Sequence, residues 1–338
     1  MKKDKNQSEK TYQVRSFLIY IVLFIIAFLA GAFIQKRISI ISKICYMILP
    51  AKKLRRNELY ELFNLDPIRE WEVAQNMREE TLPGYRRRLI NFRTGTDTTE
   101  AYLLIPGESG SGPYPAILCI HGHHSDKEEV VGITKSRNNA QFGLTLVKNG
   151  YCVLAPDIVE SQDFNREDFL ALALIARGAS LTSRRLSDLW RCVNYLKNNN
   201  KLVDKERIGV VGWSMGGGLS LYLSALNTDI RVVYVSCYFN QFAHSILSRR
   251  QTTDNYVPGL IQFGDMSDIA ALIAPRPLFL EQADRDPEFP LEYARIAFRE
   301  LQKIYQQERA TENLAMAVGE GKHVFFGKEL IPWFKKYL

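Results

Sequence analysis

The sequence has few cysteines and lacks the residue spacings that usually accompany metal or nucleotide binding. Its five cysteines are scattered over 338 residues, with no Cys-x-x-Cys pair and no His/Cys spacing typical of zinc. No Gly-x-Gly-x-x-Gly or Gly-Lys-Ser/Thr phosphate loop is present. We therefore expect no disulfide framework and no cofactor. Cys119, Cys152 and Cys237 lie in apolar runs and are predicted to be core residues.

The main body of the chain also lacks an excess of positive charge. Residues 1–56 hold twelve Lys or Arg and two Asp or Glu, which is a net charge of +10. The remaining residues hold 32 basic and 35 acidic side chains, which is a net charge of −3. A domain of this charge gives no reason to expect a nucleic-acid partner. Low-complexity tracts and internal repeats are absent too, so a globular body is predicted.

The basic arm contains a long apolar run. Residues 17–34, "FLIYIVLFIIAFLAGAFI", carry no charge, and a helix of this length reaches about 27 Å, close to a bilayer core of about 30 Å. We predict a basic tail (1–16), a single-pass transmembrane anchor (17–34) and a juxtamembrane, helical connecting segment (35–90). A signal peptide cleaved near Ala30–Ala32 is the alternative. Basic residues flank the run on both sides, so the orientation in the membrane stays open.

Residues 91–338 alternate between strand-like and helix-like patterns. Apolar strands are predicted at 101–106, 115–122, 151–158, 207–214, 230–237, 276–283 and 313–320, and helices at 139–148, 182–198 and 291–307. This alternation is typical of an α/β fold with a mostly parallel sheet covered on both faces. The long connections 158–181 and 238–270 are expected to cover a site at the carboxyl ends of the strands.

One strand-to-helix junction carries a serine between glycines. Gly212-Trp213-Ser214-Met215-Gly216 has the pattern Gly-x-Ser-x-Gly, after a predicted strand and before a predicted helix. Such a turn leaves no room for side chains beside the serine and exposes its hydroxyl above the sheet. Ser214 is therefore the candidate nucleophile.

A nucleophilic serine needs a base and an acid, which in this arrangement follow it in the order acid, then histidine. His323 lies just after the last predicted strand and is the candidate base, whereas His244 falls in a long connection and is less suitable. Asp286, at the loop tip after strand 276–283, is the candidate acid. Asp284 is the second choice for that acid.

Two backbone N–H groups are needed to bind the oxyanion that forms on the substrate. The N–H of Met215, at the helix start, and that of His123, in the loop "HGHH", are the candidates. Gly122 is expected to allow a sharp turn in that loop, and His121 is expected to be structural. Three histidines in four residues leave a metal site as a weaker alternative. Asp157 is expected to stabilise a turn or to cap a helix.

Together these motifs resemble the α/β-hydrolase superfamily, in the dienelactone-hydrolase and acetyl-esterase-like branch. The resemblance runs from about residue 90 to the C-terminus and includes "HGHHSDKEE", "VDKERIGVVGWSMGG", "APRPLFLEQADRDPEFP" and "GKHVFF". It implies an eight-stranded, mostly parallel sheet and a Ser214–Asp286–His323 triad without a cofactor or metal. It also implies hydrolysis of small carboxylic esters, such as acetyl esters of sugars, through an acyl-enzyme.

Two other functions stay open at this point. A serine peptidase related to prolyl oligopeptidase would share the serine motif, but only about 55 residues separate the apolar run from the predicted hydrolase body at 91–338. That is too few for the large extra domain those enzymes usually carry. A non-catalytic binding protein on a hydrolase fold is the other alternative, although a complete Ser/Asp/His set argues against it.

Overall fold

The structure is a computed structural model that describes residues 55–65, 72–94, 97–107, 112–136, 138–159 and 163–338. These residues belong to one compact unit that reaches from residue 51 to the C-terminus. The predicted basic tail (1–16), the predicted transmembrane anchor (17–34) and residues 35–54 of the predicted connecting segment all lie outside the described residues. Within the described ranges, no helix has both the length and the apolar character needed to span a bilayer.

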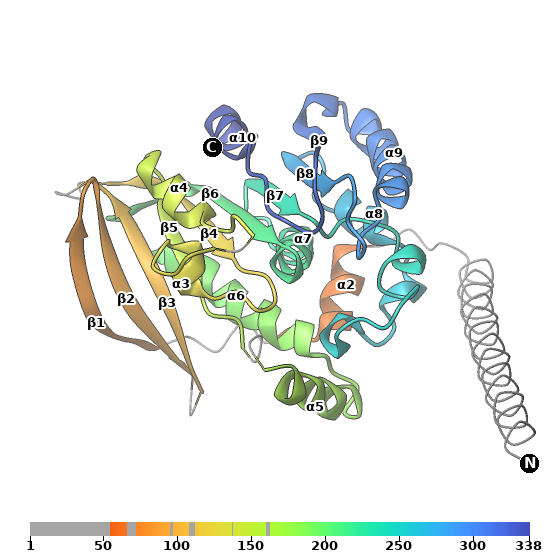
Figure 1. Ribbon diagram of the computed structural model, residues 1–338, viewed down its shortest axis with the longest axis horizontal. Coiled ribbons are helices and arrows are strands. Elements are labelled where there is room, and N and C mark those ends of the chain that lie inside the picture. Colours follow the sequence, from red (N-terminus) through yellow and green to blue (C-terminus); the bar gives the residue numbers. More distant parts are fainter. Residues whose placement is uncertain (1–54, 66–71, 95–96, 108–111, 137, 160–162) are drawn as a thin grey trace, which may run out of the picture. The chain divides into compact units, whose positions relative to one another are not determined.

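A single sheet forms the centre of the unit, in the strand order β1-β2-β3-β5-β4-β6-β7-β8-β9 (Figure 1). The strands β5, β4, β6, β7, β8 and β9 run parallel, whereas β1, β2, β3 and β5 pair antiparallel. The α/β architecture is therefore confirmed, and the described residues supply nine strands where eight were expected. The strands are β1 (Glu72–Leu82), β2 (Tyr85–Thr94), β3 (Asp97–Pro106), β4 (Tyr114–Ile120), β5 (Cys152–Pro156), β6 (Val203–Trp213), β7 (Val232–Ser236), β8 (Leu278–Ala283) and β9 (Leu314–Gly319).

The prediction of a helical connecting segment was wrong for residues 72–90. Among the residues described between 55 and 90, only α2 (Arg56–Phe63) is helical, and β1 and β2 form a hairpin that extends the sheet. The charges that favour a helix are instead paired across the hairpin. Glu79 binds Arg86 and Arg88, and Glu80 binds Arg87. Ion pairs between facing strands stabilise a sheet. Because charged side chains occupy these positions, the hairpin shows no alternating pattern of apolar residues from which strands could have been predicted.

Helices cover both faces of the sheet (Figure 1). One hydrophobic cluster joins the sheet to α3 (Lys127–Val130), α4 (Phe142–Lys148) and α10 (Leu330–Tyr337). The other cluster joins the opposite face to α2 and to the helices α6 (Leu181–Asn198), α7 (Met215–Leu226), α8 (Met266–Ala271) and α9 (Leu291–Gln307). Helices α4, α6 and α9 confirm the three helices predicted in this body.

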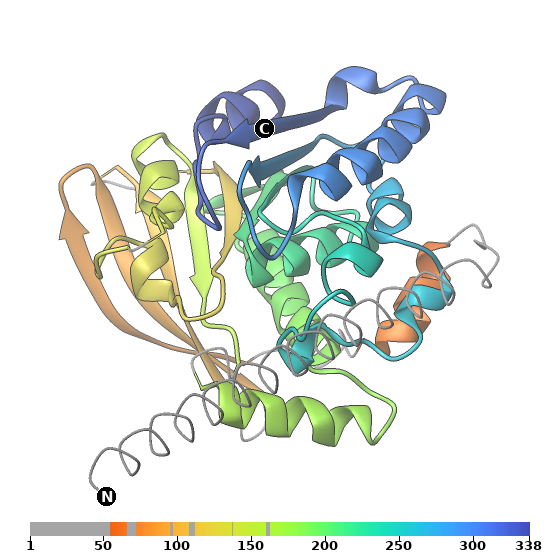
Figure 2. The same ribbon diagram turned by 45° about the vertical axis from the view of Figure 1, so that its right-hand side comes forward.

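The two long connections contain short helices. The first holds α5 (Phe164–Ile175), which lies on the outside of the unit beyond α6 (Figure 2). The second holds the 3-10 helices η1 (Phe242–His244), η2 (Thr253–Asn255) and η3 (Leu260–Gln262) and then α8. A fourth 3-10 helix, η4 (Thr311–Asn313), precedes β9. Cys119, Cys152, Cys192 and Cys237 are all buried and form no disulfide, which confirms the predicted core role of the first, second and fourth.

Candidate active site

Ser214 occupies the sharp turn between β6 and α7. Its backbone has φ 56° and ψ −124°, a conformation that side-chain-bearing residues rarely adopt and that tight functional turns stabilise. A Cβ on Gly212 would lie 2.0 Å from the Gly216 carbonyl oxygen, and a Cβ on Gly216 would lie 2.1 Å from the Ile120 carbonyl oxygen. Both glycines are therefore required by close backbone contacts, as the motif predicted.

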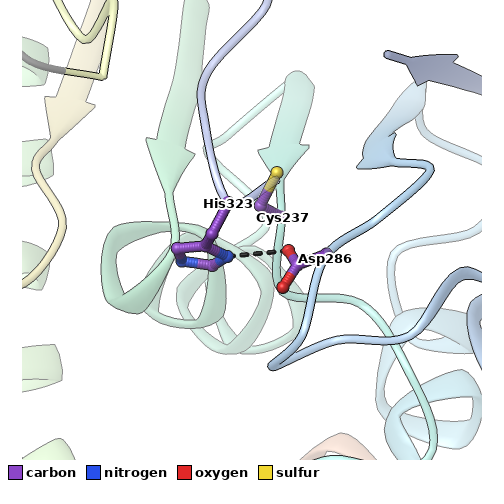
Figure 3. Close-up of side chains that lie close together, drawn as sticks. All are labelled: Cys237, Asp286 and His323. Carbon is purple, nitrogen blue, oxygen red and sulfur yellow. Dashed lines mark hydrogen bonds and ion pairs between the residues drawn. The ribbon is translucent and has the colours of Figure 1, made fainter. Parts of the chain in front are cut away.

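Ser214, His323 and Asp286 form one hydrogen-bonded chain. His323 Nε2 lies 2.6 Å from Ser214 Oγ, and His323 Nδ1 lies 2.7 Å from Asp286 Oδ2. An ionised carboxylate can only accept a hydrogen bond, so Nδ1 carries the imidazole proton and donates it to Asp286. The unprotonated Nε2 then accepts from the serine hydroxyl. Figure 3 shows the His323 and Asp286 side chains directed toward each other from two different loops.

The structure brings Asp286, and not Asp284, to the histidine. Asp286 is 4% exposed, and its Oδ1 accepts hydrogen bonds from the backbone N–H groups of Glu288 and Phe289 at 2.8 and 3.1 Å. Asp284 is exposed and accepts instead from the N–H of Gly321 at 2.7 Å. That contact ties the loop after β8 to the loop that carries His323.

The other histidine after the serine lies against a different element. The ring of His244 stacks on Tyr293 of α9 with a centroid separation of 3.7 Å. The imidazole of His323, by contrast, has the rings of Trp213 and Phe289 as neighbours, with centroids 5.4 and 5.8 Å away. These aromatic contacts restrict the orientation of the His323 ring.

Cys237 lies beside His323 and Asp286 (Figure 3). Donor atoms of these three residues lie within 4.8 Å of one another, which is close enough for a metal ion to bridge them. Burial, however, raises the pKa of the Cys237 thiol well above its usual value, and its S–H donates to the Val324 carbonyl. In addition, His323 Nδ1 carries the proton that it donates to Asp286, so this nitrogen has no lone pair left for a metal ion.

Glu281 is a buried carboxylate within β8, the strand predicted at 276–283. It is 2% exposed and accepts four hydrogen bonds. The hydroxyls of Tyr234 and Ser236 donate to it at 2.7 Å each, and the backbone N–H groups of Phe326 and Gly327 donate at 3.0 and 2.8 Å. Glu281 therefore fixes the loop that carries His323 against β7 and β8. An acidic residue inside an apolar strand was the signal that could have identified it.

The loop after β4 lies next to the nucleophile turn. A Cβ on Gly122 would lie 2.7 Å from the Trp213 ring, so glycine is needed there for close approach and not for a left-handed turn. His121 is buried. Its Nε2 accepts from the Ile158 N–H at 3.0 Å and its Nδ1 donates to the Gly122 carbonyl at 2.9 Å, which agrees with the expected structural role. Asp157 binds the ammonium of Lys127 at 2.5 Å.

His123 directs its side chain into a cluster of charged residues. Its Nε2 lies 3.0 Å from Glu167 Oε1 and 3.4 Å from Asp254 Oδ2. Burial disfavours the charged imidazole, but the hydrogen bonds and charges of Asp254 and Glu167 outweigh it and raise the pKa of His123 to about 9. The protonated ring is thus the stable form at neutral pH. The distances among His123, Glu167 and Asp254 would suit a metal ion. Arg185, however, already binds Glu167 Oε1 and Asp254 Oδ2, so a protein side chain supplies the positive charge there.

A cavity of about 440 Å³ opens at Ser214 and His323. Aromatic and polar side chains both line it; the connection 238–270 supplies five of the polar ones, and the connection 158–181 supplies Phe164. The lining residues are His123, His124, Asn138, Phe164, Trp213, Ser214, Met215, Tyr238, Arg249, Arg250, Gln251, Thr252, Asn255, Glu288, Phe289 and His323. The connections therefore form part of the pocket, as expected from their position after the strands.

Comparisons with known proteins agree with this architecture. A sequence model described as the dienelactone hydrolase family matches residues 99–292. The protein named "Putative hydrolase YtaP" from Bacillus subtilis (strain 168) is 27% identical over 299 residues, which cover 84% of this chain and 99% of that protein. A crystal structure titled "putative acetyl xylan esterase" from Bacteroides fragilis NCTC 9343 superposes with TM-score 0.68 at 21% identity, covering 83% of this chain and 86% of that chain. A glucuronoyl esterase from Solibacter usitatus gives TM-score 0.64 at 14% identity, covering 83% and 91%.

Proposed function

The chain is a carboxylic ester hydrolase that belongs to the dienelactone hydrolase family, and on this premise we propose that it cleaves short-acyl esters, acetyl esters among them, through Ser214, His323 and Asp286. The observation that carries the proposal is the continuous hydrogen-bonded chain from Ser214 Oγ through the imidazole to Asp286, at 2.6 and 2.7 Å. These lengths lie within the reach needed for proton transfer from nucleophile to base.

In the acylation step, Ser214 Oγ attacks the ester carbonyl while His323 Nε2 takes the hydroxyl proton. The imidazolium that forms is stabilised by Asp286, which also keeps the proton of Nδ1 in place. The tetrahedral intermediate then collapses, the bond to the alcohol breaks, and His323 gives its proton to the departing oxygen. A water molecule repeats the sequence on the acyl-enzyme, so that the acid leaves and Ser214 regains its proton.

The developing negative charge on the carbonyl oxygen needs donors that are already in place. We propose the backbone N–H groups of Met215 and His123 for this role. Met215 is the first residue of α7, where N–H groups have no acceptor within the helix and the helix dipole favours an anion. His123 follows β4, whose end packs against the nucleophile turn.

The size of the cavity supports a small substrate. At about 440 Å³ it lies near the lower end of the range of small-molecule sites, and it must hold both the acyl group and part of the alcohol. The rings of Trp213, Phe289 and Phe164 line it together with the amide and hydroxyl groups of Gln251, Thr252 and Asn255. Such a wall suits an alcohol with several hydroxyls, as in a sugar ester.

The test is hydrolysis of p-nitrophenyl acetate by the full chain in detergent, compared with the octanoate ester. We expect the acetate to be preferred, and Ser214→Ala to lower kcat by a factor on the order of 10⁶. Asp286→Asn should lower kcat by about 10⁴, because the imidazole then adopts the wrong tautomer. Asp284→Asn is the matched control and should leave kcat within about threefold. Equal losses in both Asn variants would contradict the assignment of the acid.

The same assays separate the two alternative functions. A peptidase related to prolyl oligopeptidase would cleave prolyl peptide substrates faster than esters. A binding protein would hydrolyse none of these substrates, and Ser214 would not react with a fluorophosphonate probe. Either result would refute the ester-hydrolase mechanism proposed for these residues.

We also propose that residues 17–34 anchor the hydrolase unit, which begins at residue 51, to a membrane. The support is the charge-free run of eighteen residues with basic residues on both sides. Expressed full-length protein should fractionate with membranes and resist alkaline carbonate extraction. Recovery of a shortened chain that begins near Ala32 in the soluble fraction would instead indicate cleavage and secretion.

A further inference from the structure

Arg185 is a fully buried arginine whose hydrogen-bonding capacity is entirely used. Its side chain is 1% exposed within α6. The Nε and Nη2 groups donate to the Val159 carbonyl at 3.1 and 2.8 Å, and Nη2 also donates to Glu167 Oε1 at 2.6 Å. Nη1 donates to Asp254 Oδ2 at 2.7 Å and to Met215 Sδ at 3.2 Å. All five N–H donors of the guanidinium therefore have an acceptor.

These acceptors come from three separate parts of the chain around the site. Val159 and Glu167 belong to the connection after β5, Asp254 belongs to the connection after β7, and Met215 follows the nucleophile. One side chain thus links both long connections to the turn that presents Ser214. A direct contact between the connections adds to this link, because the Thr253 N–H donates to Asp168 Oδ1 at 3.2 Å.

His123 approaches the same two carboxylates from the loop after β4. Its Nε2 lies 3.0 Å from Glu167 Oε1, which Arg185 also binds, and 3.4 Å from Asp254 Oδ2. With His123 protonated, the cluster holds two positive and two negative charges and is neutral overall. Such balance is what makes the burial of four charged groups tolerable. The Phe164 ring of α5 also lies against His123, with centroids 5.9 Å apart.

We propose that Arg185 is a positioning residue that, through Glu167, Asp254 and Met215, fixes the two oxyanion donors relative to Ser214. The inference rests on the ester-hydrolase function proposed above. One oxyanion donor belongs to Met215, whose side chain Arg185 contacts directly. The other belongs to His123, whose side chain Arg185 restrains through the shared carboxylates. The cluster therefore connects the backbone on both sides of the developing oxyanion.

Lysine cannot reproduce this arrangement. An ammonium has three donors in place of five and lacks the planar fork that matches two carboxylates and a carbonyl at once. Arg185→Lys keeps the positive charge, so the burial of Glu167 and Asp254 stays compensated, but contacts to Val159 or Met215 are lost. Since misplacement of a reacting or stabilising group by about 1 Å can cost about 100-fold in rate, the loss should appear in the chemical step.

The test measures kcat for p-nitrophenyl acetate per active site in the full chain, with sites counted by complete fluorophosphonate labelling. We expect Arg185→Lys to lower kcat per labelled site by 10- to 100-fold. Glu167→Gln, which keeps the shape of the side chain, should lower it in the same direction by a smaller factor and serves if the lysine variant does not fold. Arg177→Lys is the matched control, because Arg177 is exposed just beyond α5, and its kcat should be unchanged.

The outcomes distinguish a positioning role from a purely structural one. If the variants only reduce the number of labelled sites, while kcat per site stays at the wild-type value, the positioning role is refuted. If the wild-type chain itself fails to hydrolyse esters, the proposed function fails, and this inference falls with it. Wild-type activity together with a lower kcat per site in the variants is the result that supports both.

Discussion

Replacing Glu281 by glutamine tests how much of the site depends on the support of the histidine loop. The carboxylate accepts from two hydroxyls, which can rotate, and from the backbone N–H groups of Phe326 and Gly327, which cannot. Each carboxylate oxygen receives one hydroxyl and one backbone N–H. Whichever way a glutamine amide turns, its NH₂ therefore faces one of the two N–H groups and leaves it without an acceptor.

The size of the effect follows from this count. One buried backbone donor left unsatisfied costs roughly 1–3 kcal/mol, and the remaining hydrogen bonds lose the contribution of the negative charge. We expect Glu281→Gln to lower the free energy of unfolding by roughly 2–4 kcal/mol. A domain of this size is stable by roughly 5–15 kcal/mol, so the variant should still fold. The loop with His323 should be less well ordered, and kcat should fall by roughly 10-fold or more.

Urea unfolding and esterase assays on the same samples measure both effects. The matched control is Glu320→Gln, the same chemical change at an exposed position of the loop after β9, and neither quantity should change there. A Glu281→Gln variant with wild-type stability and wild-type kcat would refute the reasoning. It would mean that the loop is held by its other contacts, such as the Asp284 to Gly321 hydrogen bond.

Two further predictions follow from the site. The pKa of His123 is raised to about 9 from an ordinary value near 6.5. The protonated ring therefore contributes its full stabilisation below about pH 6.5, and this contribution is lost as pH rises through about 9. The urea midpoint of unfolding should fall over that interval, and His123→Gln should remove this pH dependence. Gly216→Ala places a Cβ 2.1 Å from the Ile120 carbonyl oxygen and should lower thermal stability and reduce kcat by roughly 10- to 100-fold; a stable alanine variant with normal kcat would contradict the steric argument.

The sequence predicted the parallel part of the sheet and the serine turn because both depend on local patterns. The parallel strands, from β4 to β9, are apolar runs that the sequence marks one by one, and the antiparallel β3 is marked in the same way. The turn at Ser214 requires glycine at two fixed positions. Once those elements were placed, the carboxyl ends of the strands limited the candidates for acid and base to a few residues, among them Asp286 and His323.

The choice between Asp284 and Asp286 depended on details that the sequence does not carry. Both lie in the loop after β8, two residues apart. In the structure, the N–H groups of Glu288 and Phe289 turn the loop back over Asp286 and bury it, while Asp284 faces solvent. Side-chain direction within a short loop is set by such hydrogen bonds, which sequence spacing does not specify.

The sequence of α6 also indicates that Arg185 belongs to a buried charged cluster. Along α6, the buried residues Leu181, Arg185, Leu189, Cys192 and Leu196 recur at helical spacing, so an arginine occupies a position where the pattern calls for an apolar side chain. A guanidinium on such a stripe must find carboxylates, since burying it alone would cost too much free energy. The partners lie in connections without strand or helix periodicity, at Glu167 and Asp254, so their identity could not be predicted. The sequence does predict that Arg185 needs carboxylate partners, and it predicts that the two long connections around the site are the segments that supply them.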